Sequence, residues 1–145
     1  MSTSIRNIFF EHDVCAMIPS TLEDQHRCFD RKAGEGFYRE YRFTKYDANR
    51  LMGMKPDLSA IQPWAGFIMF RKTKETVEFV EEWLKYCEDY LIISFDESVL
   101  GKELPGFRAN RNDQTVLGVL LRKNHWKCKS LPHHWLYNVR NDKTL

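Results

Sequence analysis

The segment Arg111-Asn112-Asp113-Gln114 places a carboxylate directly before an apolar helical pattern. A helix N-terminus presents unpaired backbone N–H groups and a partial positive charge, so a carboxylate there stays ionised and held in place. Asp113 is therefore a candidate catalytic base or hydroxyl-binding acid, with Gln114 beside it. The structural alternative is that Asn112 or Asp113 serves as an ordinary helix cap.

Histidine, cysteine and acidic residues offer two candidate metal sites. The ligand types of a zinc site occur near the C-terminus, but their spacing matches no common structural zinc site: His125, Cys128, His133 and His134. Glu11 and Asp13 follow the apolar run Ile8-Phe9-Phe10. Carboxylates at the end of a strand suit a hard cation such as Mg²⁺ or Mn²⁺, whereas a solvated charged turn is the simpler interpretation.

Composition and length indicate one folded domain over residues 1–145, with a weakly patterned N-terminal segment over 1–40. The net charge of +2, with acidic and basic residues interspersed, argues against a generic nucleic-acid binder. No apolar window is long enough for a membrane span, so we expect the chain as given to be soluble. If it is part of a larger enzyme, we expect that enzyme in the cytoplasm or in a secretory lumen. The 4 cysteines form no Cys-x-x-Cys pair, and we expect free thiols.

The elements expected to position Asp113 alternate between helix and strand, which predicts an α/β fold with a mixed sheet and flanking helices. Thr44 to Asp47 has the form of a capping box before a helix over 48–52, which Gly53 would end in a left-handed conformation. Residues 65–70 form an uninterrupted apolar run typical of a buried strand. Gly66 at its start would form either the floor of a ligand site or a close packing contact.

The second half of the chain carries the clearest helical patterns. From Thr73 an apolar stripe is expected to face the core, namely Val77, Val80, Trp83, Leu84, Cys87 and Leu91. Residues 94–111 show no period and predict a long connection, which in compact domains often lines a site. The next helix is expected to turn Val116, Leu117, Leu120 and Leu121 inward, and alternation over 126–130 predicts a half-buried strand.

Taken in order, these pieces resemble the acceptor-side, C-terminal portion of the nucleotide-sugar-dependent glycosyltransferases of the GT-A fold. The resemblance covers about residues 41–138. It rests on Phe43-Thr44-Lys45-Tyr46-Asp47, Gln62-Pro63-Trp64-Ala65-Gly66-Phe67-Ile68-Met69-Phe70-Arg71-Lys72-Thr73, Phe79 to Cys87, Arg111-Asn112-Asp113-Gln114-Thr115-Val116-Leu117, and Leu131-Pro132 leading to Trp135-Leu136-Tyr137-Asn138.

The resemblance implies transfer of a hexosyl-type sugar from a nucleoside diphosphate sugar to a hydroxyl of a glycan or another acceptor. Asp113, with Gln114, would face the acceptor and the sugar, either deprotonating the attacking hydroxyl or orienting the sugar. Other expected substrate contacts are Trp64, Gly66, Arg111 and Trp135. The resemblance further implies Mn²⁺ or Mg²⁺ bridging the diphosphate, held by His133 or His134, with Glu11 and Asp13 as the nearest substitute for an Asp-x-Asp.

GT-A enzymes begin with a nucleotide-binding half that ends in an Asp-x-Asp, and this half has no counterpart in the chain. We therefore expect it upstream of Met1 in a truncated gene, or on a partner chain, unless the chain is a remnant without turnover. Two other functions remain open. The chain could be a non-catalytic module whose Trp64, Trp126 and Trp135 hold a glycan or a protein, or a metal-dependent nuclease built on Asp96, Glu97 and Asp113.

Overall fold

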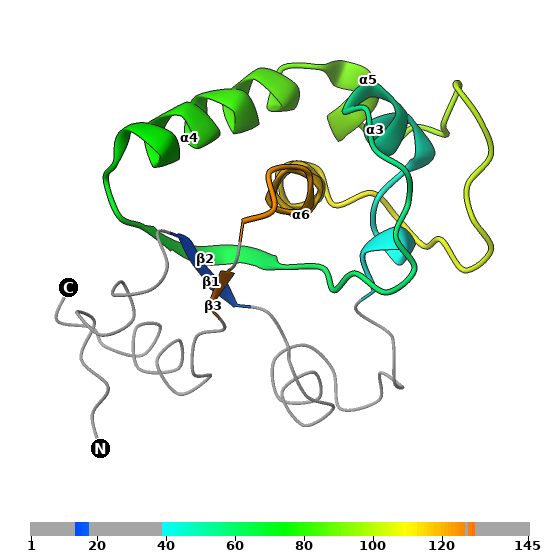
Figure 1. Ribbon diagram of the computed structural model, residues 1–145. Coiled ribbons are helices and arrows are strands. Elements are labelled where there is room, and N and C mark those ends of the chain that lie inside the picture. The colour runs from blue at the N-terminus through cyan, green and yellow to red at the C-terminus, as the bar shows by residue number, and fades with distance from the viewer. Residues whose placement is uncertain (1–13, 18–38, 127, 130–145) are drawn as a thin grey trace, which may run out of the picture.

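Helix α6 (Asp113–Lys123) passes through the middle of the fold and carries its core (Figure 1). The computed structural model describes residues 14–17, 39–126 and 128–129. Seven consecutive residues of α6, from 115 to 121, are buried, which means that all sides of the helix are covered. The inward positions expected at Val116, Leu117, Leu120 and Leu121 are confirmed. Gly118 keeps α6 close to the chain before β2, since a Cβ there would lie 3.2 Å from the ring of Pro63.

A three-stranded mixed sheet lies on one side of α6 (Figure 1). Strand β1 (Val14–Met17) is central, antiparallel to β2 (Trp64–Phe70) and parallel to β3 (Cys128–Lys129). The register pairs Val14 with both Phe70 and Cys128. The expected mixed α/β class with a mixed sheet is therefore confirmed, as is the strand predicted over 65–70.

Helix α4 (Lys74–Cys87) covers the other side of α6 and begins at a capping box formed by Thr73 and Thr76. The prediction of which α4 residues face the core is wrong for the aliphatic residues of this helix. The described structure leaves three of them exposed at 40 to 62%, namely Val77, Val80 and Leu84. The helix instead buries Thr76 and Phe79 and packs Trp83 and Tyr86 at the edge of the core. It has apolar groups on two faces, and the face with the larger rings is the one that meets α6.

The other helices within residues 39–126 are short: the 3-10 turn η1 (Glu40–Arg42), α3 (Tyr46–Leu51) and α5 (Tyr90–Ile93). The predicted capping box over 44–47 is wrong, because Lys45 is the N-cap and no side chain caps α3. Gly53 does take the expected left-handed conformation, with φ of 71°. Residues 94–112, here called the 94–112 loop, contain no helix or strand, as predicted.

A membrane-spanning helix needs about 20 predominantly apolar residues. No helix within residues 39–126 is long and apolar enough to cross a bilayer.

Candidate functional site

Asp113 is the first residue of α6 and is exposed. Its carboxylate has no hydrogen bond or ion pair with any residue in the described part of the chain. Its main chain is fixed, because the indole N–H of Trp83 donates to the Asp113 carbonyl oxygen at 3.0 Å. A carboxylate open to solvent thus lies at the start of α6, seven of whose residues are buried.

Asn112, immediately before Asp113, has an unusual backbone conformation with φ of 48° and ψ of −119°. This region is costly for a residue with a Cβ, on the order of 1–3 kcal/mol. The expected side-chain cap is not formed. Instead, Asn112 Nδ2 donates to the carbonyl oxygen of Ile93 at 2.5 Å, which ties the start of α6 to the end of α5. The strained residue is therefore held by a specific bond directly beside the candidate acid.

Arg111 and Gln114 flank Asp113 in different settings. The exposed Arg111 side chain places its guanidinium 4.9 Å from the centre of the Phe43 ring, a cation–π contact. The Gln114 carbonyl oxygen accepts a hydrogen bond from Gln62 Nε2 at 2.9 Å. Gln62 lies two residues before Trp64, so this bond joins the start of β2 to the start of α6.

Trp64 and Gly66 both lie on β2, and the side chain of Trp64 packs against the backbone of Gly66. A Cβ at Gly66 would lie 2.2 Å from the Trp64 ring, so the Trp64 indole itself occupies the space beside this backbone. Gly66 thus makes room for Trp64 of the same strand. Because the indole covers it, a ligand on this face of β2 would meet Trp64 before Gly66.

The charge of the Asp113 carboxylate affects the pKa of the Cys87 thiol. Partial burial, and secondly the Asp113 carboxylate, raise the pKa of the Cys87 thiol to about 11. A thiol with this pKa is almost wholly protonated at neutral pH and is a poor nucleophile. Cys87 is therefore no alternative to Asp113 as the reactive group of this site.

Five of the expected site residues fall outside the described residues: Glu11, Asp13, His133, His134 and Trp135. Within the described ranges, three or more His, Cys, Asp or Glu side chains nowhere come together to hold a metal ion. The carboxylate of Asp96, one of the acids of the expected nuclease site, accepts a hydrogen bond from the Tyr90 hydroxyl at 2.7 Å.

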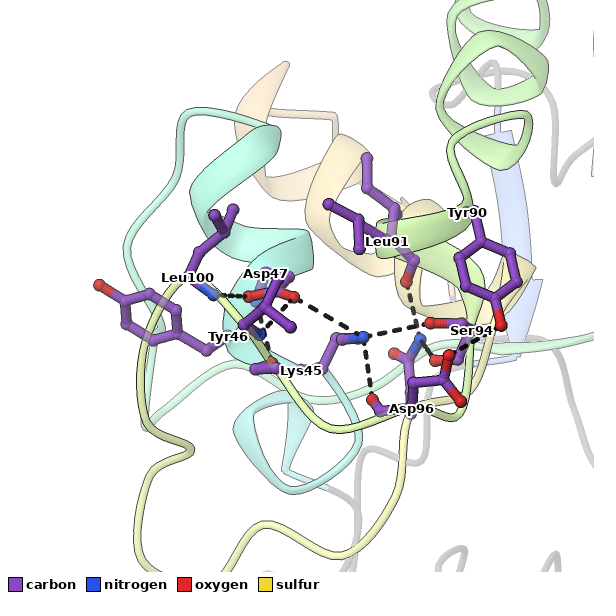
Figure 2. A network of polar contacts seen from close by, with 12 residues as sticks. Lys45, Tyr46, Asp47, Tyr90, Leu91, Ser94, Asp96 and Leu100 are labelled. Carbon is purple, nitrogen blue, oxygen red and sulfur yellow. Dashed lines mark hydrogen bonds and ion pairs between the residues drawn. The ribbon is translucent and has the colours of Figure 1, made fainter.

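The sequence interpretation missed a buried polar network around Lys45 and Asp47 (Figure 2). Both side chains are at most 1% exposed, and Lys45 Nζ lies 3.8 Å from Asp47 Oδ2. The Asp47 carboxylate accepts the backbone N–H groups of Val99 at 3.0 Å and Leu100 at 2.9 Å. Lys45 Nζ donates to Ser94 Oγ at 3.3 Å and to the Asp96 carbonyl oxygen at 3.0 Å.

The Lys45–Asp47 pair therefore binds the 94–112 loop at two places. Asn110 fixes the far end of the loop, since its Nδ2 donates to the carbonyl oxygens of Ile92 at 2.7 Å and Ser94 at 3.0 Å. The loop has no ladder of its own, and these side chains supply the partners that its backbone needs. Its course from α5 to Asp113 is consequently fixed by buried bonds.

A pocket of about 510 Å³ opens along this loop between Phe95 and Asn110. Asp113, Gln114 and Arg111 do not line it. The described structure thus has two distinct features of interest: the exposed acid at the start of α6, and the pocket along the loop that leads to it.

Comparisons with known protein families, with curated proteins and with solved structures found no match to this chain.

Proposed function

We propose that this chain is the acceptor-side part of a GT-A-like glycosyltransferase, in which Asp113 faces the sugar or the acceptor hydroxyl. The observation that carries the proposal is the start of α6. A carboxylate without a partner among the described residues follows a strained, non-glycine residue that a specific hydrogen bond holds in place. Strained backbone of this kind concentrates at functional sites, where the rest of the fold pays its cost.

In either form of the reaction, the role of Asp113 requires only that its carboxylate is ionised and lies within hydrogen-bond reach of the substrate. As an acceptor oxygen attacks the sugar carbon, the hydroxyl loses a proton, and a carboxylate within hydrogen-bond reach takes it. If the reaction retains configuration, Asp113 instead accepts a hydrogen bond from a sugar hydroxyl and orients the ring. The exposed guanidinium of Arg111 and the amide of Gln114 are the neighbouring groups available to other hydroxyls.

The described residues do not form a site for Mn²⁺ or Mg²⁺, which require several oxygen ligands. The ion expected from the resemblance would be held by His133, His134, Glu11 or Asp13, or by a nucleotide-binding half on another chain. When bound, it would neutralise charge on the departing diphosphate. The role given to Asp113 does not depend on which residues hold it.

The test is release of nucleoside diphosphate from nucleoside diphosphate sugars by a complete enzyme, in which this chain is combined with the nucleotide-binding half, with Mn²⁺ present and neutral methyl glycosides as acceptors. Asp113→Asn keeps the size of the side chain but removes the base, and should lower turnover by about 10²-fold or more. Glu81→Gln, which removes another exposed carboxylate, on α4, is the matched control and should keep full activity.

Calorimetry separates the proposal from its rival, a non-catalytic module that binds a glycan or a protein. A transferase should bind the nucleoside diphosphate sugar, and Mn²⁺ should tighten that binding. A complete enzyme, with the nucleotide-binding half supplied, that neither releases nor binds any nucleotide, or whose turnover Asp113→Asn leaves unchanged, would contradict the assignment.

A further inference from the structure

The pocket along the 94–112 loop is walled by both apolar and charged groups. Two phenyl rings line it, those of Phe95, which is 76% exposed, and Phe107, which is half-buried. Three carboxylates and two cations share the lining, so its formal charge is only about −1: Asp96, Glu97, Glu103, Lys102 and Arg108. Its volume of about 510 Å³ lies within the usual range for small-molecule sites.

Two of the three carboxylates are already occupied by bonds within the fold. Asp96 accepts the Tyr90 hydroxyl, and Glu103 accepts both the Ser98 hydroxyl and the backbone N–H of Tyr46, the latter at 2.9 Å. Glu97 and Lys102 are exposed and make no such bond within residues 39–126. Among the described residues that line the pocket, Glu97 therefore offers a carboxylate, and Lys102 an ammonium, that is open to a ligand beside the two aromatic rings.

The backbone of the loop that forms the pocket is held by hydrogen bonds to other parts of the fold. The Asp47 carboxylate accepts the backbone N–H groups of Val99 and Leu100, and Lys45 Nζ donates to the Asp96 carbonyl oxygen. Figure 2 shows Lys45 and Asp47 beside Asp96 and Leu100. At the other end of the loop, Asn110 Nδ2 donates to the carbonyl oxygens of Ile92 and Ser94. A loop fixed in this way loses little conformational entropy when a ligand binds, so a small ligand keeps more of its contact energy.

We propose that this pocket binds one neutral pyranose ring of a glycan. A pyranose presents an apolar C–H face, which packs on a phenyl ring, and hydroxyls that both donate and accept hydrogen bonds. The C–H face matches the phenyl rings of Phe95 and Phe107. The hydroxyls match the carboxylate of Glu97 and the ammonium of Lys102. A phosphorylated ligand fits less well, because the lining carries more negative than positive charge. The inference rests on the pocket alone and does not require Asp113 to be catalytic.

The experiment is an NMR titration of the ¹⁵N-labelled full chain with neutral methyl hexopyranosides and their di- to tetrasaccharides. We expect saturable shifts of the backbone amides of residues 95–110. Phe95→Ala should weaken binding by about tenfold, since the contact of one ring face is worth about that much. Phe95 is largely exposed, so this substitution should leave the fold unchanged.

Two controls separate the pocket from its surroundings. Leu84→Ala removes a comparably exposed apolar side chain from α4, at 62% exposure, and should leave the affinity unchanged. Asp113→Asn should also leave it unchanged, so failure of the proposed transferase activity would be distinguishable from failure of this inference.

Three outcomes would overturn the proposal. One is the absence of saturable shifts at 95–110 with every neutral saccharide. A second is unchanged affinity in Phe95→Ala. The third is tighter binding of a hexose phosphate than of the matching neutral hexose, which would assign the pocket to an anionic ligand.

Discussion

Asp47→Asn measures how strongly the Lys45–Asp47 pair stabilises the fold. The asparagine keeps the shape of the side chain but has one oxygen, whereas Asp47 uses two, one for Val99 and one for Leu100. Its amide would face a backbone N–H, donor against donor. One hydrogen bond to a charged group, worth about 1.5–3 kcal/mol, is therefore lost.

The same change leaves the Lys45 ammonium buried without its counter-charge. Removing one partner of a buried pair costs about 3–5 kcal/mol, but Lys45 retains Ser94 Oγ and the Asp96 carbonyl oxygen. These two penalties overlap, so we expect the free energy of unfolding to fall by about 3–5 kcal/mol in total. Such a loss is a large fraction of the stability of a small domain.

Urea denaturation measures the loss, and hydrogen exchange at the amides of Val99 and Leu100 shows whether it begins in the 94–112 loop. Asp89→Asn is the matched control. Asp89 caps α5 by accepting the N–H of Leu91 at 2.9 Å, and asparagine caps equally well. A loss below about 1 kcal/mol for Asp47→Asn, or unchanged exchange at both amides, would refute the reasoning.

Two further groups give predictions from their burial and charge. Arg122 Nη2 lies 2.7 Å from Oε1 of the buried Glu40, so Arg122→Met should lower the free energy of unfolding by about 3–5 kcal/mol at pH 7. Burial raises the pKa of Glu40 above 4.5, and Arg122 opposes this rise, so the pKa of Glu40 should be higher still in the variant. Because Glu40 then takes up a proton as the pH falls toward 4.5, the loss of unfolding free energy measured by denaturation should shrink over that range. An equal loss at pH 7 and at pH 4.5 would contradict this. Alkylation of Cys87 at pH 8, followed by peptide mass spectrometry, should be about a hundredfold slower in the folded chain than in urea, because its pKa rises from 9.0 to about 11; equal rates would contradict the burial of this thiol.

The order of elements was predictable because its signals are local. The uninterrupted apolar run over 65–70 predicted a strand, and the helical spacing of apolar residues from 116 to 121 predicted which residues of α6 are buried. The structure confirms both. Helix α4 has two apolar faces, and periodicity alone gave no reason to prefer Phe79 over Val77 and Val80. Only the presence of α6 on one side decides which face is buried.

The site was predictable in part, for the same reason. An acid at the start of an apolar helix is a local pattern, and Asp113 lies where it was expected. Asp47 also has a local pattern, that of a capping box, but its partners at 99 and 100 are over fifty residues away. For these partners the sequence carried only a weaker signal, which was the long stretch over 94–111 with no helical or strand periodicity.

The enclosure of α6 has a consequence for how the chain reaches its folded state. The helix is buried by β2, α3, α4 and α5, all of which precede it in the sequence. During synthesis these elements emerge with their apolar faces uncovered, because the residues from 115 to 121 that fill the core are made after them. Folding must therefore wait for contacts of long sequence separation, which form slowly. A nascent chain stalled before residue 113 would expose this unfilled core and would therefore be prone to aggregation.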